Sequence, residues 1–422
     1  MRRVHWISLG ILLSTALAVR LLWSLVLGAN TPFGDEAEYL GDARLIYTHQ
    51  PVVHQNWMLF IRAPGYSYFL ATVWTLAGGE SRASIHVAQA ILSTATCAFV
   101  FALARRIGAS PIGALVATAF ASFHPFLVYM VAPLGTEAVF AFFVVSGAYF
   151  LVAGLDSEAS RDRWWRLALS GLLLGIGNMF RPNLQTILPL VALWLVIRYR
   201  RRLRLAVATF AVLVFPIIAV ALPWSLAVER AGYGWVWVTD GGAVWYFIGH
   251  NDLAYDLYCA ETPSAPRSQL IRLGEAQITH WPGYLRAKAA PIKERQREFW
   301  KVALEWDRAH LYAEPCLAFT KLYSFWRPWV NRDAYPLKMF LVSLASAPPL
   351  LLGLWGTWLA FRRGERTATI FTWMVAGSGT FVAVVFSTEI RYRIPMVDVL
   401  LIPFVGMVVD RAFPSLRGDV RT

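Results

Sequence analysis

The chain has 422 residues, of which 57% are hydrophobic and 15% charged, and its formal net charge is +13. Average soluble proteins carry about 25% charged residues, so this composition excludes an ordinary water-soluble globule, a disordered chain and a disulfide scaffold. The basic charge does not predict nucleic-acid binding, because the arginines cluster in short segments between long apolar runs, as in the cytoplasmic loops of membrane proteins.

The apolar runs predict an all-α polytopic membrane protein of about ten transmembrane helices with interfacial helices on its outer face. A spanning helix needs about 20 mostly apolar residues to cross about 30 Å of hydrocarbon. In chain order the expected spans are 6–27, 84–103, 112–131, 137–153, 167–180, 184–197, 205–222, 337–361, 368–387 and 394–409.

Two apolar stretches can be interpreted in more than one way, and only the first belongs to the spans given above. The fifth and sixth share one apolar stretch that is broken at Arg181 and Pro182, and we interpret them as a tight hairpin. Residues 66–77 are apolar but shorter than a span and follow Pro64 and Gly65, so we expect an interfacial helix there.

The arginine clusters fix the predicted topology, because this arrangement places every short cluster on one side of the membrane. By the positive-inside rule both termini are then cytoplasmic. We expect the first segment to be retained rather than cleaved as a signal peptide, because Arg20 interrupts its apolar run. The clusters lie at 2–3, 105–106, 161–166, 198–204, 362–366 and 411–421.

Residues 1–422 are expected to form a single transmembrane domain with two long outer loops, 28–83 and 223–336. Long connections of this kind are usually functional, and the second has helical patterning that predicts a cap over the bundle. It also contains Cys259 and Cys316, which could pair in an oxidising compartment or stay as free thiols.

The sequence GDEAEYL places Asp35 and Glu36 just after the first span. Acids at a helix start can simply cap the helix and complement its dipole. The functional alternative is a carboxylate at the membrane surface that accepts a proton from an acceptor hydroxyl, or that holds an acceptor amine or a metal ion. We predict Asp35 as the catalytic residue, with Glu36 as its companion.

Several arginines fall on the same predicted outer level as these acids. Arginine holds phosphate bidentately and stays charged, so a convergent set would bind the phosphate of a lipid, although any single one could be a snorkelling anchor. Arg20 is an intramembrane charge and therefore also a candidate. The predicted phosphate-binding residues are Arg62, Arg391, Arg393, Arg181 and Arg20.

The remaining motifs are less specific. The stretch GGAVWYFIGHND could form a plain loop or meet a sugar through His250 and Asn251. The eight histidines and three cysteines show no recognisable ligand spacing, so we predict no metal site and no cofactor, and a divalent cation is not indicated. No phosphate-binding glycine loop is evident in the sequence. This absence bears on the energy source, because an enzyme acting outside the cytoplasm would need a donor that carries its own activation.

Taken in order, these motifs resemble those of the GT-C membrane glycosyltransferases. The nearest branch is the bacterial relatives of the protein O-mannosyltransferases and lipid A aminoarabinose transferases. The resemblance covers nearly the whole chain. It rests on Asp35-Glu36, Arg62-Ala63-Pro64-Gly65-Tyr66, Thr136-Glu137, Gly171 to Gly175 with Arg181-Pro182, Leu222-Pro223-Trp224, Gly241 to Asn251, and Arg391-Tyr392-Arg393-Ile394-Pro395.

The resemblance implies an inverting glycosyltransferase that uses a polyprenyl-phosphate-linked sugar at the periplasmic face of the bacterial inner membrane. Asp35 matches the catalytic carboxylate of the family. The implied partners are the lipid donor, a glycan, lipid or protein acceptor, and membrane lipids, with no nucleic acid. The expected sugar- and acceptor-binding residues are Tyr66, Glu137, His250, Asn251 and Tyr392.

The alternative is a polytopic transporter or lipid flippase, which would also be basic and aromatic. Transporters usually place ionisable residues near the bilayer midplane. Here the charges cluster at one surface, with Asp398 in the last span as a candidate exception. The sequence therefore favours transfer chemistry, and it leaves the donor sugar, the acceptor and the oligomeric state open.

Overall fold

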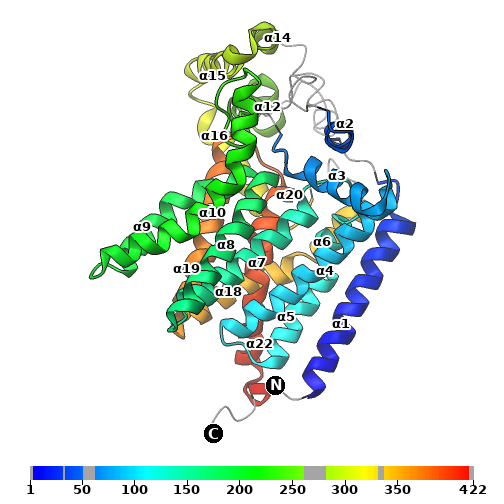
Figure 1. The fold of residues 1–422 in the computed structure, drawn as a ribbon, viewed down its shortest axis with the longest axis vertical. Coiled ribbons are helices and arrows are strands. Elements are labelled where there is room, and N and C mark those ends of the chain that lie inside the picture. Colours follow the sequence, from blue (N-terminus) through cyan, green and yellow to red (C-terminus); the bar gives the residue numbers. More distant parts are fainter. Residues whose placement is uncertain (1–2, 32–33, 51–61, 261–281, 331–336, 418–422) are drawn as a thin grey trace.

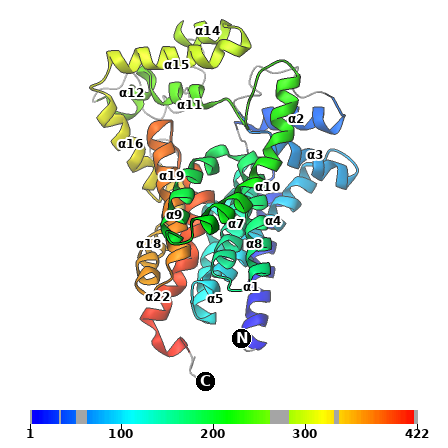
Figure 2. The same ribbon diagram turned by 60° about the vertical axis from the view of Figure 1, so that its left-hand side comes forward.

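The computed structural model describes residues 3–31, 34–50, 62–260, 282–330 and 337–417. Within these ranges the chain is helical and contains no strand, which confirms the predicted all-α membrane fold. The helices form one elongated bundle (Figure 1). Both ends of the chain lie at one end of this bundle, and helices α11, α12, α14, α15 and α16 cover the other end, which we call the cap end (Figures 1 and 2).

Within the part of the chain that the structure describes, seven helical segments are long and apolar enough to cross a membrane. They are Arg3–Leu27, Arg82–Arg106, Glu137–Leu155, Leu203–Arg230, Leu337–Arg362, Arg366–Val385 and Ile390–Ala412. The first is α1 (Arg3–Leu22) continued by η1 (Trp23–Leu27), the next three are α4, α7 and α10, and the fifth combines α17 (Leu337–Leu344) with α18 (Ala347–Arg362). The sixth is α19.

The other three expected spans are not uniform long apolar helices. The third is divided into α5 (Pro111–Phe123) and α6 (Pro125–Tyr129), because Pro125 cannot continue the α5 hydrogen-bond pattern. The fifth lies in α8 (Ser160–Phe180), whose first turns carry several arginines. The sixth begins as the 3₁₀ turn η3 (Pro182–Ile187) and continues as α9 (Leu188–Arg198), so the predicted break at Arg181-Pro182 is present.

Close helix packing explains the glycine motif in α8. A Cβ atom built on Gly171 would lie 2.1 Å from the Leu213 carbonyl oxygen of α10, and one on Gly175 would lie 2.8 Å from the Ile217 Cα. Small residues at such contacts let helix backbones approach each other within a membrane. The motif therefore serves helix packing, and it places the C-terminal end of α8, followed by Arg181, against the bundle.

The last span is the most buried of the seven, with 89% of its apolar window inside the protein. It runs through α20 (Ile390–Arg393), η4 (Ile394–Asp398), α21 (Val399–Leu401), η5 (Ile402–Phe404) and α22 (Val405–Ala412). Because this span lies inside the bundle, the Arg391 and Tyr392 pair at its start is held at the cap end, close to the ends of α7 and α8.

Two long segments between spans add helices at the cap end (Figure 2). One follows the first span, and the other lies between α10 and α17. The first long loop contains α2 (Glu36–Tyr47) and α3 (Gly65–Ala77), the latter matching the short helix expected at 66–77. The second contains α11 (Gly242–Gly249), α12 (Asp252–Tyr258), α14 (Pro282–Ala289), α15 (Ile292–Ala309) and α16 (Glu314–Trp326). Helix α10 continues to Arg230, beyond the expected boundary at 222.

The cap has its own small core and a covalent link. Phe247 of α11 contacts Tyr284 and Phe299 of α14 and α15, with ring centroids 6.4 and 5.7 Å away. Cys259 and Cys316, which the sequence left open as a pair or as free thiols, form a disulfide with Cα atoms 5.9 Å apart. The disulfide joins the end of α12 to α16, so the cap helices are held together as one unit.

Candidate active site

Asp35 lies at the position that precedes α2, but its side chain makes no hydrogen bond to the helix end. Instead its carboxylate pairs with two arginines from distant parts of the chain. One oxygen lies 2.8 Å from Arg62 Nη2 and the other lies 3.5 Å from Arg391 Nη1. The capping explanation therefore does not describe this side chain, whereas an ion-pair cluster does.

Arg62 is fixed by several contacts besides Asp35. Its Nε also pairs with Glu38 of α2, and its guanidinium lies 5.8 Å from the ring centroid of Tyr39 and 5.9 Å from that of Trp245. Burial lowers the pKa of Arg62, but the charges of Asp35, Tyr39 and Glu38 outweigh this effect and leave the pKa above its ordinary value. This guanidinium is permanently charged and well oriented.

A second acid and a third arginine complete the cluster. Arg181 Nη2 lies 2.5 Å from Glu137 Oε1, and Arg181 Nε donates a hydrogen bond to Thr136 Oγ1 at 2.8 Å. Arg391 Nη1 lies 4.0 Å from the same Glu137 oxygen, so Arg391 bridges the two carboxylates. The Tyr392 ring packs against both guanidinium groups, with centroids 5.0 and 5.4 Å away.

The cluster thus joins the guanidiniums of Arg62, Arg181 and Arg391 to the carboxylates of Asp35 and Glu137, with Glu38 and Glu389 as outer partners. These groups come from the start of α2, the segment just before α3, the start of α7, the end of α8 and the start of α20. Guanidinium groups supply planar pairs of donors that match a phosphate or a carboxylate. A carboxylate among them can accept a proton from a hydroxyl, provided that an anion competes for its arginine partners. The geometry suits an anionic leaving group beside a base.

Glu36 lies outside this cluster. It pairs with Arg82 at the start of α4, where Arg82 Nη2 donates to Glu36 Oε2 at 3.1 Å. Arg82 also donates from Nε to the Ala29 carbonyl at 3.0 Å. This pair fastens α2 to the membrane bundle, a positioning role that the sequence did not reveal, because Arg82 is one charge in a long helix with no motif around it.

Arg20 was predicted to bind phosphate, but the structure places it inside the bundle, away from the acids. It is fully buried and donates to Ser93 Oγ at 2.8 Å and to the Ser122 carbonyl at 2.9 Å. These contacts link α1 to α4 and to the C-terminal end of α5, where helix carbonyls have no intrahelical partners. The predicted donor-binding role for Arg20 has no support from this position.

Arg393 is likewise committed to the protein interior, contrary to its predicted role. Its guanidinium forms a bidentate pair with Asp398, at 2.8 and 3.0 Å, and donates to the carbonyl groups of Phe325 and Arg327 at 2.7 and 2.8 Å. Both side chains are almost completely buried. Of the two arginines in the RYR sequence, only Arg391 reaches the acids, because residues two apart point to different sides of a helix.

Tyr66 was expected to contact the sugar or acceptor, and it is fully buried near the cluster. Its hydroxyl donates to Gln89 Oε1 at 2.8 Å, and its ring packs edge-on against Tyr39, with centroids 4.9 Å apart. Gln89 in turn donates to the Val131 carbonyl at 2.9 Å. The tyrosine therefore supports the α2 face that carries Asp35, rather than presenting its hydroxyl to the cluster.

His250 and Asn251 are also buried; Asn251 makes its contacts within the cap, whereas His250 joins the cap to the end of α19. Asn251 accepts a hydrogen bond from Ala254 N at 2.8 Å and so caps α12. His250 Nδ1 lies 3.2 Å from Asp307 and 3.1 Å from Glu314, and its Nε2 lies 2.9 Å from both the Val385 carbonyl and Lys321 Nζ. Neither residue contacts the arginine cluster.

The His250 contacts form the one group, within the described residues, whose geometry could hold a metal ion. The ligand atoms of His250, Asp307 and Glu314 lie within 4.8 Å of one another. Lys321 is buried beside them, and this burial lowers its pKa to about 8 despite the neighbouring Glu314 and Asp307 carboxylates. These side chains already satisfy one another by hydrogen bonds, and the group is separate from Asp35.

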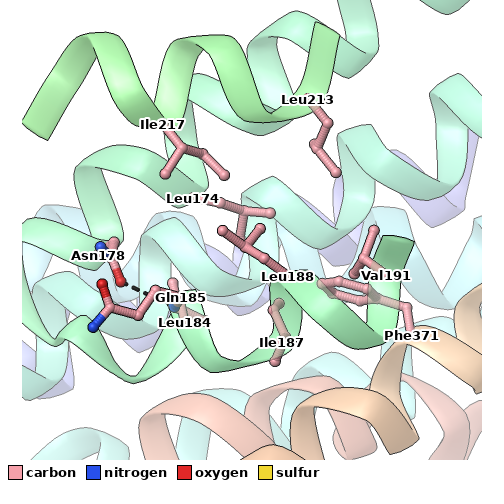
Figure 3. Close-up of a pocket in the computed structure, with 10 residues that line it drawn as sticks. All are labelled: Leu174, Asn178, Leu184, Gln185, Ile187, Leu188, Val191, Leu213, Ile217 and Phe371. Carbon is pink, nitrogen blue, oxygen red and sulfur yellow. Dashed lines mark hydrogen bonds between the residues drawn. The ribbon is translucent and has the colours of Figure 1, made fainter. Parts of the chain in front are cut away.

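A small, largely apolar pocket lies between α8, η3, α9, α10 and α19 (Figure 3). Its polar lining residues are Asn178 and Gln185, and Asn178 accepts a hydrogen bond from Gln185 N at 3.1 Å. The lining residues are Leu174, Asn178, Leu184, Gln185, Ile187, Leu188, Val191, Leu213, Ile217 and Phe371.

Comparison with known proteins finds similarity in part of the sequence and in the fold. The model of the dolichyl-phosphate-mannose-protein mannosyltransferase family matches residues 61–224. Undecaprenyl phosphate-alpha-4-amino-4-deoxy-L-arabinose arabinosyl transferases from two Pseudomonas aeruginosa strains are 25% identical over 198 residues. The aligned part is 46% of this chain and 36% of those proteins, so the match spans about a third of their length.

The fold is similar to solved structures of the Archaeoglobus fulgidus oligosaccharyltransferase. The apo form aligns with a TM-score of 0.56 at 13% identity, over 96% of this chain and 51% of that protein. A complex with an inhibitory peptide and a dolichol-phosphate aligns with a TM-score of 0.53 at 12% identity, over 100% and 53%. The resemblance inferred from the motifs is thereby confirmed: residues 61–224 match a membrane mannosyltransferase family model, part of the chain is similar to lipid-linked aminoarabinose transferases, and its fold is similar to that of an oligosaccharyltransferase.

Proposed function

We propose that the protein transfers a glycosyl group from a polyprenyl-phosphate-linked donor to an acceptor hydroxyl or amine, with inversion at the anomeric carbon. The observation that carries this proposal is the position of Asp35 between Arg62 and Arg391, at 2.8 and 3.5 Å. A base and a set of phosphate-binding groups are thereby adjacent, as a displacement at a sugar phosphate requires.

In the proposed reaction the acceptor oxygen attacks C1 of the sugar while the bond from C1 to the phosphate oxygen breaks. The acceptor proton passes to Asp35, and the lipid phosphate leaves as an anion. Arg391 and Arg181 stabilise the charge that grows on this phosphate, and one such donor can contribute about 3 to 4 kcal/mol. No general acid is needed, because a phosphate is a stable leaving group.

In the proposed reaction the donor also changes the contacts of Asp35. A donor phosphate that binds Arg391 competes with Asp35 for the Nη1 group of Arg391. This group lies 3.5 Å from the Asp35 carboxylate, farther than the 2.8 Å that separates Arg62 Nη2 from Asp35. Donor binding is thus proposed to release the Asp35 carboxylate from Arg391.

We further propose that this site faces the periplasm. The arginine clusters and the positive-inside rule support this orientation, and a disulfide between Cys259 and Cys316 is typical of an oxidising compartment. The test is to introduce a cysteine at Arg286, which is exposed on α14, and to label intact cells with a membrane-impermeant maleimide. Labelling only after permeabilisation would contradict the proposed side.

The activity is tested with purified protein and a panel of polyprenyl-phosphate sugars, measuring release of the lipid phosphate. We expect release with at least one donor when an acceptor extract is present, and no release from Asp35→Asn. No release with any donor would contradict the proposal. The transporter alternative gains no support from Arg20 and Arg393, because both are held by protein groups within the bundle.

A further inference from the structure

We propose that α11 is a positioning element for the active site: Trp245 holds Arg62 in place, and the His250 contacts hold α11 against the bundle. The inference rests on the proposed function in treating Asp35 as the base. It assigns a positioning role to Trp245 and to His250, the latter expected from sequence to meet the sugar.

The first contact is between α11 and the arginine that pairs with Asp35. The Arg62 guanidinium lies 5.9 Å from the Trp245 ring centroid. It also contacts the Tyr39 ring and pairs with Glu38 and Asp35. Cation–π contacts of this kind orient a guanidinium without competing for its hydrogen bonds. Trp245 thus limits where Arg62, and with it the Asp35 carboxylate, can lie.

The next residue fixes the orientation of α11 within the cap. The Tyr246 hydroxyl donates to Asp307 Oδ2 at 2.6 Å, and its ring stacks on His250 with centroids 4.1 Å apart. The Asp307 and Glu314 carboxylates contact Nδ1 at the edge of the His250 ring, at 3.2 and 3.1 Å. Because Trp245 and Tyr246 are adjacent, a shift of this network would move the Trp245 ring.

The C-terminal end of α11 contacts the segment that leads to Arg391. His250 Nε2 lies 2.9 Å from the Val385 carbonyl oxygen, at the end of α19. A Cβ atom on Gly249 would lie 1.7 Å from the Phe386 carbonyl oxygen, so only glycine allows this approach. The chain continues from Phe386 through Glu389, which pairs with Arg391.

Helix α11 is therefore in contact with both arms that reach Asp35, one through Arg62 and one through the segment before Arg391. The disulfide between Cys259 and Cys316 and the α15 and α16 carboxylates secure it from the cap side. The arrangement predicts that losing Trp245 changes turnover through Arg62, rather than through the fold or the donor phosphate contacts.

The first test does not require activity. Phenylglyoxal modification of arginines is followed by mass spectrometry in the wild type, Trp245→Ala, Trp245→Phe, His250→Gln and a control, Trp235→Ala, whose ring is 52% exposed. We expect Arg62 to react several-fold faster in Trp245→Ala and His250→Gln than in the wild type, and near the wild-type rate in Trp245→Phe and the control. Exposed Arg44 should react equally in all of them. An unchanged Arg62 rate in Trp245→Ala, or a parallel rise at Arg44, would overturn the inference.

The second test is a double-mutant cycle on turnover. If Trp245 acts through Arg62, Trp245→Ala should lower kcat about 3- to 30-fold in the wild type, in the range of a cation–π contact, and less than twofold in an Arg62→Ala background. The donor KM should change little. An equal fold loss in both backgrounds would refute the positioning role, whereas a wild type without activity would refute the proposed function and leave the modification test to decide.

Discussion

Replacing Asp35 with asparagine separates the two roles of the cluster, because it removes the charge and keeps the shape. A general base contributes about 10²- to 10⁴-fold to a rate, so we expect kcat to fall by at least 100-fold. The same change removes a competitor of the donor phosphate. Opposite charges about 4 Å apart interact by about 4 kcal/mol at an effective dielectric constant near 20, and part of this attraction becomes available to the phosphate.

Asp35→Asn should therefore bind polyprenyl phosphate as tightly as the wild type or more tightly, while transfer is lost. Binding can be measured by tryptophan fluorescence or by protection against thermal unfolding, and transfer by single-turnover release of the lipid phosphate. The matched control is Asp42→Asn, which removes a carboxylate from α2, the helix that Asp35 precedes, without an ion pair to Arg62 or Arg391. Turnover of Asp35→Asn within threefold of the wild type would refute the role of Asp35 as base, and weaker lipid binding would refute the competition.

Three further outcomes follow from the same contacts. Arg391→Ala should raise the Kd for the donor about 10- to 100-fold. Arg391→Lys should be intermediate, because a lysine keeps the charge but not the planar donors. Equal Kd values for the wild type and Arg391→Ala in a binding titration would make Arg391 an anchor only. Arg393→Met should cost about 3 to 5 kcal/mol of stability by leaving Asp398 unpaired, seen as a lower Tm that the double variant with Asp398→Leu recovers; a donor-binding defect without a stability loss would contradict this. Burial and Glu38 raise the pKa of Asp42 to about 6. The charged form is thus disfavoured in the fold, so Asp42→Asn should have a higher Tm than the wild type at pH 8, with the difference shrinking as the pH falls from about 6 toward 4. A difference in Tm that is constant with pH would show that Asp42 does not titrate as described.

Much of the fold was accessible from local sequence. Hydropathy over windows of about 20 residues predicts spanning helices, because each one must bury its backbone groups within itself in a bilayer. The break was predicted from Arg181 and Pro182, and the helix expected at 66–77 was predicted from an apolar stretch too short to span; the structure has a 3₁₀ turn from Pro182 and a helix at Gly65–Ala77. The number of long spans was less accurate, because a proline at position 125 and the arginines in α8 shorten apolar runs that packing nevertheless keeps in the bundle.

The sequence by itself determined that acids and arginines gather at one end of a membrane bundle, since side preference depends on charge and segment order alone. Only the tertiary structure decided which of them meet. Arg62, Arg181 and Arg391 reach Asp35 and Glu137, whereas the guanidiniums of Arg20 and Arg393 are taken up by buried groups elsewhere. Ion pairs between residues hundreds of positions apart depend on helix rotation and packing, and a rotation of one residue, about 100°, changes which side chain faces the site.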